Sequence, residues 1–192
     1  MKWIYATIDE YTPDELHAVK ELLSPSRKER IFRLRQEKDR LRSLAAECLL
    51  RQLLQEMGVK NCAIECTELG QPITDCGLFV SIAHSGNHIV CAASEKPIGI
   101  DLEEIRPMDF AITRHVCTED ENRYIFGRDP LPEDLKRCED PETLTRFFEI
   151  WTGKEAYFKQ QGTGIRDLKG ISILPLPRLV IQKSGCIITI YE

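Results

Sequence analysis

The chain has 192 residues and a formal net charge of −5, with 42% hydrophobic and 30% charged residues. That length suggests one domain or two small, closely packed ones, and the hydrophobic fraction is sufficient for a buried core. The acidic net charge argues against general nucleic-acid binding, which needs a broadly basic surface. No stretch approaches roughly 18 consecutive apolar residues, so no membrane span is expected.

The N-terminal segment and the cysteines indicate a cytoplasmic protein. The chain turns acidic at Asp9 and Glu10, too early for a signal peptide. The eight cysteines include no C-x-x-C pair, and the close pair Cys62 and Cys66 lacks the further ligands of a zinc site. We therefore expect reduced thiols that fill core space.

The first sixty residues predict a strand followed by helices. Residues 2–8 alternate like a short strand. Thr12, Pro13 and Glu15 then match the N-cap, the first position and the N3 position of a helix. Apolar residues recur at helical spacing through residues 24–58, which predicts one long helix or two joined ones.

Three short β segments come next, at residues 78–85, 88–95 and 97–104. Short turn sequences separate them, so we expect an antiparallel meander. Residues 108–126 have a helical pattern.

The last third predicts a helix and a β-hairpin. Residues 127–142 are rich in proline and acids and are predicted to be a loop, and residues 143–161 a helix. Residues 171–192 return to strands, with KSG as a hairpin turn. This order predicts an α+β fold with two similar halves, residues 1–104 and 105–192.

Two carboxylates share one face of the third β segment. Because alternate residues of a strand face opposite ways, Gly99, Asp101 and Glu103 lie opposite an apolar face. The two carboxylates are then about 6–7 Å apart along the strand. A solvated polar face is the simpler explanation, and a shared cation is the alternative.

A later helix carries a third carboxylate of interest. Phe148, Trp151, Glu155, Phe158 and Lys159 recur near one stripe of that helix, so a carboxylate interrupts an aromatic face. Glu155 and Lys159 could simply pair at i, i+4. Otherwise a partly buried carboxylate needs a metal, and three acids without His or Cys favour Mg²⁺ over zinc.

A basic segment stands out in this acidic chain. Residues 27–42 hold eight Lys and Arg against three acids, a net charge of +5. This pattern fits either a solvated helix face or a site for a multiply phosphorylated small molecule. His84 could bond a phosphate or cap its turn.

Three segments, SIAHSG, PIGIDLE and WTGKEAYFKQQGTGI, resemble the Sfp-type 4′-phosphopantetheinyl transferases in order and spacing. The similarity extends upstream through the basic segment and ELGQP, and covers roughly residues 24–170. The resemblance implies a pseudo-twofold fold of two α+β halves, with coenzyme A and Mg²⁺ in an active cleft between them. It also implies transfer of phosphopantetheine from coenzyme A to a serine of an acyl or peptidyl carrier protein.

The resemblance carries roles to individual residues. Asp101, Glu103 and Glu155 match the Mg²⁺ ligands, and Glu155 or Glu103 (or a metal-bound water) would deprotonate the serine. Lys154 and Lys159 match cleft lysines, and Lys159 would contact the pyrophosphate and stabilise the leaving 3′,5′-ADP. The positions that match contacts to the 3′-phosphoadenosine are Arg27, Arg30, Arg42, Ser43 and His84.

The chain also departs from the family pattern. Gln71 stands where the family often has lysine, and Ala83 where it usually has serine. A further family acid falls among Glu119, Asp120 and Glu121, and the pattern does not choose between them. Relatives usually continue into another strand after CIITIYE, so the second sheet is expected to be one strand short.

Two rival functions remain open at this level. One is a coenzyme A-binding relative that no longer transfers, suggested by Gln71, Ala83 and the short C-terminus. The other is a Mg²⁺-dependent phosphodiesterase that acts on a nucleotide-like substrate. In each case we expect a monomer that binds neither nucleic acid nor membranes.

Overall fold

Two antiparallel three-stranded sheets form the centre of the protein in the computed structural model, which describes residues 1–164 and 166–192. The first sheet has the order β1 (Lys2–Thr7), β5 (His88–Ser94), β4 (Phe79–Ser85). The second has the order β6 (Gly99–Glu104), β10 (Cys186–Tyr191), β9 (Leu179–Lys183). The predicted combination of helices and sheets is confirmed. Ile165, the last residue of one motif quoted above, lies outside the described residues.

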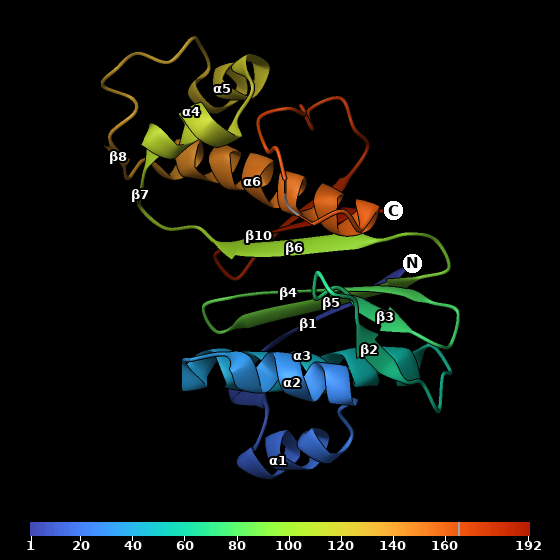
Figure 1. Ribbon diagram of the computed structural model, residues 1–192. Coiled ribbons are helices and arrows are strands. Elements are labelled where there is room, and N and C mark those ends of the chain that lie inside the picture. Colours follow the sequence, from blue (N-terminus) through green and yellow to red (C-terminus); the bar gives the residue numbers. More distant parts are fainter. Residues whose placement is uncertain (165) are drawn as a thin grey trace.

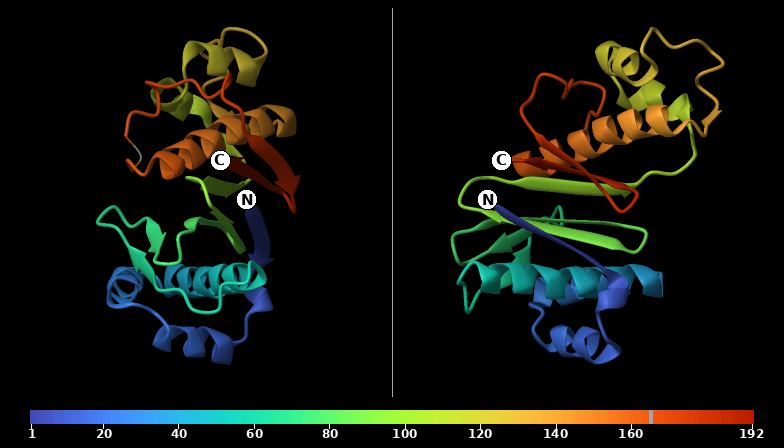
Figure 2. Two further views of the ribbon diagram at one scale, coloured as in Figure 1. Left: turned by 90° about the vertical axis from the view of Figure 1, so that its right-hand side faces the viewer. Right: turned by 180° about the vertical axis from the view of Figure 1, so that it is seen from behind.

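Helices cover the outer faces of both sheets (Figure 1). α2 (Pro25–Arg33) and α3 (Glu37–Glu56) run along the first sheet, with α1 (Pro13–Glu21) beyond them. α6 (Pro141–Gln161) crosses the second sheet. Figure 2 shows the same layers from the side and from behind, with the two chain ends close together.

Smaller elements complete the two outer layers. The remaining short helices are η1 (Ile8–Glu10), η2 (Phe110–Ile112), α4 (Thr113–Val116) and α5 (Glu119–Phe126). Two short hairpin-like pairs are β2 (Ile64–Cys66) with β3 (Pro72–Thr74), and β7 (Met108–Asp109) with β8 (Arg137–Cys138). No described helix has both the length and the apolar character needed to cross a bilayer.

Strand alternation produces three apolar layers. Ile89 and Cys91 of β5 pack against the α3 side, whereas Val90 of the same strand packs between the sheets. Ile100 and Leu102 of β6 join that middle layer. A third cluster, which includes Phe110, Phe147, Phe148 and Ile150, lies between the second sheet and the helices outside it.

The edge strands β4 and β6 lie side by side without a backbone ladder between them. Instead, the Ser81 hydroxyl accepts from the Ile100 amide (3.0 Å) and the Ser85 hydroxyl from the Glu104 amide (3.3 Å). We call this junction the seam. The predicted meander is therefore wrong for its third strand: β5 is central, with β1 and β4 on its two edges, so β6 pairs with β10.

Local capping signals explain the helix boundaries. Thr12 accepts from the Glu15 amide in a reciprocal capping box at the start of α1, as predicted. Residues 24–58 form two joined helices, α2 and α3, and not one long helix, so the second of the two predicted alternatives is confirmed. The predicted 108–126 helix is interrupted, because Thr118 begins a new helix through a second capping box with Glu121. The predicted hairpin at KSG is confirmed, with Ser184 and Gly185 both at positive φ.

At Gly99 the backbone of α6 lies very close to the second sheet. A Cβ at this position would lie 1.9 Å from the Ala156 carbonyl oxygen and 2.5 Å from the Gln160 amide nitrogen, both backbone atoms of α6. Because backbone cannot move aside cheaply, we expect Gly99→Ala to lower the free energy of unfolding by about 2–3 kcal/mol. Urea unfolding measures this. Gly77→Ala, where a Cβ meets no atom within 4 Å but φ is +78°, gives the cost of a positive φ without a clash, a cost that does not arise at Gly99. An unfolding midpoint for Gly99→Ala equal to wild type would contradict the close packing.

Candidate functional site

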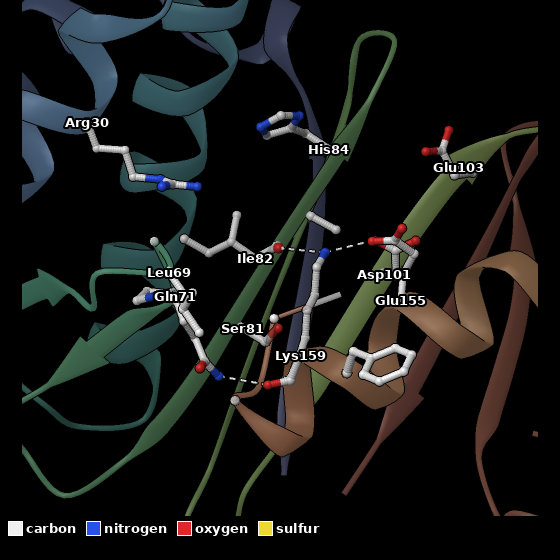
Figure 3. A pocket seen from close by; sticks show the side chains of 16 residues that line it. Arg30, Leu69, Gln71, Ser81, Ile82, His84, Asp101, Glu103, Glu155 and Lys159 are labelled. Carbon is white, nitrogen blue, oxygen red and sulfur yellow. Dashed lines mark hydrogen bonds and ion pairs between the residues drawn. The ribbon is translucent and has the colours of Figure 1, made fainter. Parts of the chain in front are cut away.

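A cavity of about 420 Å³ opens along the seam between β4 and β6 (Figure 3). The end of α6 and the loop between β2 and β3 complete its walls. Six of the residues predicted from the sequence line it: Arg30, His84, Asp101, Glu103, Glu155 and Lys159. The fold therefore brings a carboxylate group and a basic group, far apart in sequence, to one cavity.

A second cavity of about 390 Å³ adjoins the first. Arg30 and His84 line both cavities, and Arg27 and Ser43 line the second one. The two cavities together form a two-lobed cleft, with acids in the first lobe and a more basic second lobe.

Lys159 connects the two sides of the seam. Its ammonium lies 2.7 Å from Asp101 Oδ1 and donates to the carbonyl oxygens of Ile82 on β4 (3.2 Å) and Ile100 on β6 (3.1 Å). The second carboxylate oxygen of Asp101 is buried and has no hydrogen-bond partner within the described part of the chain. A buried carboxylate oxygen without a partner is costly, so this atom is suited to a ligand.

Burial and mutual repulsion perturb the three acids. Burial, and then the neighbouring Asp101 carboxylate, raise the pKa of Glu155 to about 7. Burial also raises the pKa of Asp101 and of Glu103. Glu103 Oε2 accepts from the Ser85 hydroxyl at 2.6 Å, and its carboxylate lies apart from the adjacent Asp101 and Glu155 in Figure 3.

The donors suit a hard divalent cation, because carboxylate oxygens are the ligands that Mg²⁺ prefers. Asp101 offers a free oxygen, and a cation would relieve the repulsion that keeps Glu155 protonated. As they stand, no three His, Cys, Asp or Glu side chains among residues 1–164 and 166–192 converge on one point. The Lys159 ammonium already contacts Asp101 Oδ1, and the Ser85 hydroxyl donates to Glu103 Oε2. A cation shared by all three acids would therefore require Glu103, which lies apart from the other two carboxylates, to turn toward them.

The raised pKa of Glu155 predicts how stability depends on pH. Between about pH 4.5 and pH 7 the folded protein holds a proton on Glu155 that the unfolded chain has released. Stability therefore falls as pH rises through this window. We expect wild type to lose on the order of 2 kcal/mol relative to Glu155→Gln, after allowance for partial solvent exposure. Urea unfolding of both proteins in chelator at several pH values gives the difference. A constant difference across the window would contradict the assignment.

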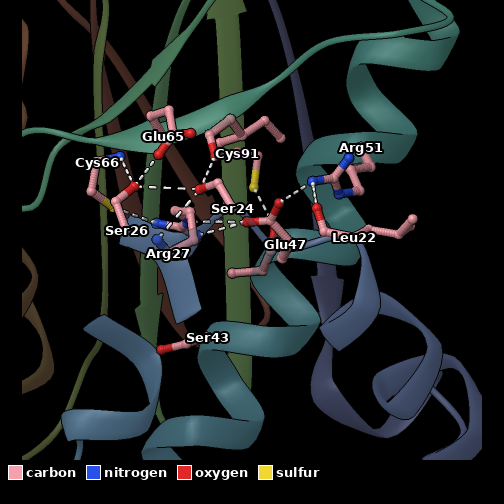
Figure 4. A network of polar contacts seen from close by, with 12 residues as sticks. Leu22, Ser24, Ser26, Arg27, Ser43, Glu47, Arg51, Glu65, Cys66 and Cys91 are labelled. Carbon is pink, nitrogen blue, oxygen red and sulfur yellow. Dashed lines mark hydrogen bonds and ion pairs between the residues drawn. The ribbon is translucent and has the colours of Figure 1, made fainter. Parts of the chain in front are cut away.

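Arg27 lines the second lobe, but its guanidinium is paired with a buried acid, so its role as a phosphate contact stays a prediction. Its Nε and Nη2 lie 3.0 and 2.9 Å from Glu47 Oε2, and Nη1 contacts the Cys66 sulfur (Figure 4). Glu47 is fully buried and pairs with Arg51 as well. Because a buried acid needs its partners, Arg27 supports α2 against α3 at the wall of the second lobe.

The other predicted basic positions differ from one another. Arg30 lies against Gly70, where a Cβ would overlap its guanidinium. Ser43 lines the second lobe and donates to the Asp39 carbonyl oxygen at 2.9 Å. Arg42 pairs with the Asp39 carboxylate at 2.9 Å and does not line either cavity.

Lys154 does not lie at the cleft, contrary to prediction. Its side chain is 1% exposed, and its ammonium lies 2.8 Å from Glu121 Oε2 and donates to the carbonyl oxygens of Leu168 and Ile171. Of the three candidate acids, Glu121 is the buried one, and Glu119 and Asp120 are exposed. None of the three lines the cleft.

Gln71 and Ser81 line the first lobe but lay outside the predicted site, and Gln71 also differs from the family pattern. Gln71 lines the first lobe, and its side-chain amide donates to the Lys159 carbonyl oxygen at 2.7 Å. Ser81 and Ser85 join the two strands of the seam. Their i, i+4 spacing on β4 places both on one strand face, but no local signal indicates that β6 lies beside them.

Comparison with known proteins points to one group of enzymes. Residues 97–187 match the 4′-phosphopantetheinyl transferase superfamily. The chain is 32% identical over 158 residues to the 4′-phosphopantetheinyl transferase gsp of Aneurinibacillus migulanus, covering 81% of this chain and 60% of that protein. It is 33% identical over 132 residues to the transferase psf-1 of Bacillus pumilus (66% and 52%). It is 26% identical over 148 residues to the transferase Sfp of Bacillus subtilis (74% and 62%). The chain thus spans about half to three fifths of the length of these relatives.

Proposed function

Because residues 97–187 match the 4′-phosphopantetheinyl transferase superfamily, and similarity to named transferases extends beyond that range, we propose that this chain catalyses the same kind of transfer. The donor is coenzyme A, and the acceptor is a serine of an acyl or peptidyl carrier protein. The products are the phosphopantetheinylated carrier and 3′,5′-ADP.

The observation that carries this proposal is the division of charge within the cleft. Asp101, Glu103 and Glu155 line one lobe, and Arg30 and His84 line both lobes. Coenzyme A carries a 3′-phosphate and a pyrophosphate, so it needs basic contacts at one end and charge neutralisation at the other. A two-lobed cleft with this arrangement accommodates both requirements.

Asp101, Glu103 and Glu155 would hold Mg²⁺, which supplies charge neutralisation on the pyrophosphate when bound. Glu155, which lines the acidic lobe, would accept the proton of the incoming serine hydroxyl. The serine oxygen bonds to the β-phosphorus as the bond between that phosphorus and the bridging oxygen breaks. Lys159 stabilises the negative charge that remains on 3′,5′-ADP.

We extend the proposal to the organisation of the chain. Residues 1–104 and 105–192 form two halves related by a pseudo-twofold axis, and the cleft lies between them. In support, the two three-stranded sheets have the same order: in each, the first strand in sequence (β1 or β6) is at an edge and the last (β5 or β10) is in the middle. β6 belongs to residues 1–104 by sequence and to the second sheet by its pairing with β10. The protein acts as a monomer in the cytoplasm, a compartment in which most thiols are reduced, and its eight cysteines are free in the structure.

Incubation with coenzyme A, Mg²⁺ and an apo carrier protein, followed by mass spectrometry of the carrier, tests the function. A carrier that gains the phosphopantetheine mass supports transfer. Cleavage of coenzyme A without carrier modification would replace the proposal with hydrolysis. Binding of coenzyme A with neither product would replace it with a non-catalytic role.

A further inference from the structure

Cys62 and Cys76 form a pair at the base of the β2–β3 hairpin. Their sulfur atoms are 2.8 Å apart, and both side chains are partly exposed. All eight cysteines lie in the described part of the chain, and this is the one sulfur–sulfur hydrogen bond among them. A disulfide bond is about 2.05 Å long, so the two sulfurs need to approach by about 0.8 Å to bond.

The strand register independently places these residues opposite each other. Ile64 pairs with Thr74 and Cys66 with Pro72, and the Asp75 amide donates to the Ala63 carbonyl oxygen one step further out. Continuing this register by one more step pairs residue 62 with residue 76. The ladder ends at Ile64 and Thr74, and the Ala63 amide donates to the Asp75 carboxylate, so residues 62 and 76 lie just beyond it. Opposed Cα atoms of an antiparallel pair are about 4.5–5.5 Å apart, within the range that a disulfide spans.

We propose that Cys62 and Cys76 are a reversible disulfide site that closes the base of the β2–β3 hairpin. The oxidant is a low-molecular-weight disulfide such as glutathione disulfide. This inference does not depend on the proposed transferase activity.

The two thiols have different roles in the exchange. Although partial burial acts to raise it, the pKa of Cys76 is lowered, chiefly because its sulfur accepts a hydrogen bond from the Cys62 thiol. Burial and the same contact raise the pKa of Cys62. The Cys76 thiolate therefore attacks glutathione disulfide, forms a mixed disulfide and releases one glutathione. Cys62 then loses its proton, attacks the Cys76 sulfur and releases the second glutathione.

The hairpin links this site to the cleft. At its far end, Leu69, Gly70, Gln71 and Pro72 line the cavities, and the Gln71 amide bonds to α6. A covalent bond at the base fixes both strands of the hairpin to each other. Oxidation therefore holds one wall of the cleft in place.

Intact mass and peptide mapping after incubation with glutathione disulfide test the proposal on the full chain. We expect the loss of two hydrogen atoms, a peptide cross-linked through Cys62 and Cys76, and full reversal by dithiothreitol. Cys62→Ser should accumulate a stable glutathione adduct at residue 76, and Cys76→Ser should form no such adduct at residue 62 on the same timescale. Cys138→Ser, which replaces another partly exposed thiol, should oxidise like wild type.

A wild-type protein that retains a glutathione adduct without a cross-link, or that cross-links other cysteines, overturns the proposal. Hydrogen exchange supplies a second readout. In the oxidised protein the amides of residues 63–75 should exchange at least about tenfold more slowly than in the reduced protein. Unchanged exchange in this segment would show that the bond does not close the hairpin.

Discussion

Glu155→Gln should lower the rate of carrier modification by at least about 100-fold, the range typical for loss of a positioned proton acceptor. The side chain lies beside Asp101 in the acidic lobe and has a pKa of about 7, so it can exchange a proton at neutral pH. Glutamine keeps the shape but can neither accept that proton nor offer a charged oxygen to a cation. The measurement is the initial rate of mass gain by the carrier at saturating coenzyme A and Mg²⁺.

The fold of this variant should remain intact, because the substitution removes a charge that burial and Asp101 already disfavour. Glu142→Gln is a matched control on the same helix. Glu142 is exposed and pairs with Arg146, so its loss should change the rate by less than about twofold. Wild-type turnover by Glu155→Gln would contradict the role of Glu155 both as proton acceptor and as metal ligand.

Period-two alternation was sufficient to predict one wall of the cleft. It separated Ile100 and Leu102, which the structure buries between the sheets, from Asp101 and Glu103, which line the cavity. Gly99 lies on the same face, where the backbone of α6 leaves no room for a side chain. Local geometry alone decides which side of a strand a residue faces.

Strand pairing could not be predicted in the same way. The β6 segment follows β5 in sequence, yet its partner β10 comes from the end of the chain. Pairing depends on which edges are free, and β1 already occupies the edge of β5 that a meander would use. The seam between β4 and β6, and with it Ser81 and Ser85, follows from this long-range arrangement.

The sequence also did not show that two adjacent charged residues of α6 point to different parts of the protein. Lys154 and Glu155 are neighbours on α6, but successive helical residues point about 100° apart. Glu155 therefore faces the cleft, whereas Lys154 points into the half of the protein that contains Glu121. The pairing of Arg27 with Glu47 was likewise not predictable from local sequence, since Glu47 lies on the next helix.

Lys154→Met should lower the free energy of unfolding by about 3–5 kcal/mol, the cost of breaking a buried ion pair by removing one partner. The ammonium is bonded to Glu121 and to two backbone carbonyl groups, so the variant leaves a buried carboxylate and two unsatisfied oxygens. Urea unfolding at neutral pH measures the loss. Lys28→Met is the control: Lys28 lies 4.0 Å from an exposed acid, and its replacement should change stability by less than about 0.5 kcal/mol.

Further variants distinguish the structural role of Lys154 from the ligand-binding role of Lys159. Adding Glu121→Gln to Lys154→Met removes the stranded charge but keeps an acceptor for the Ile173 amide, so part of the lost stability should return. Lys159→Met should instead weaken coenzyme A binding, because its ammonium faces the cleft. At a temperature where Lys154→Met is folded, that variant should bind coenzyme A like wild type. If folded Lys154→Met bound coenzyme A more weakly than wild type, Lys154 would be a ligand-binding residue, and its purely structural role would be contradicted.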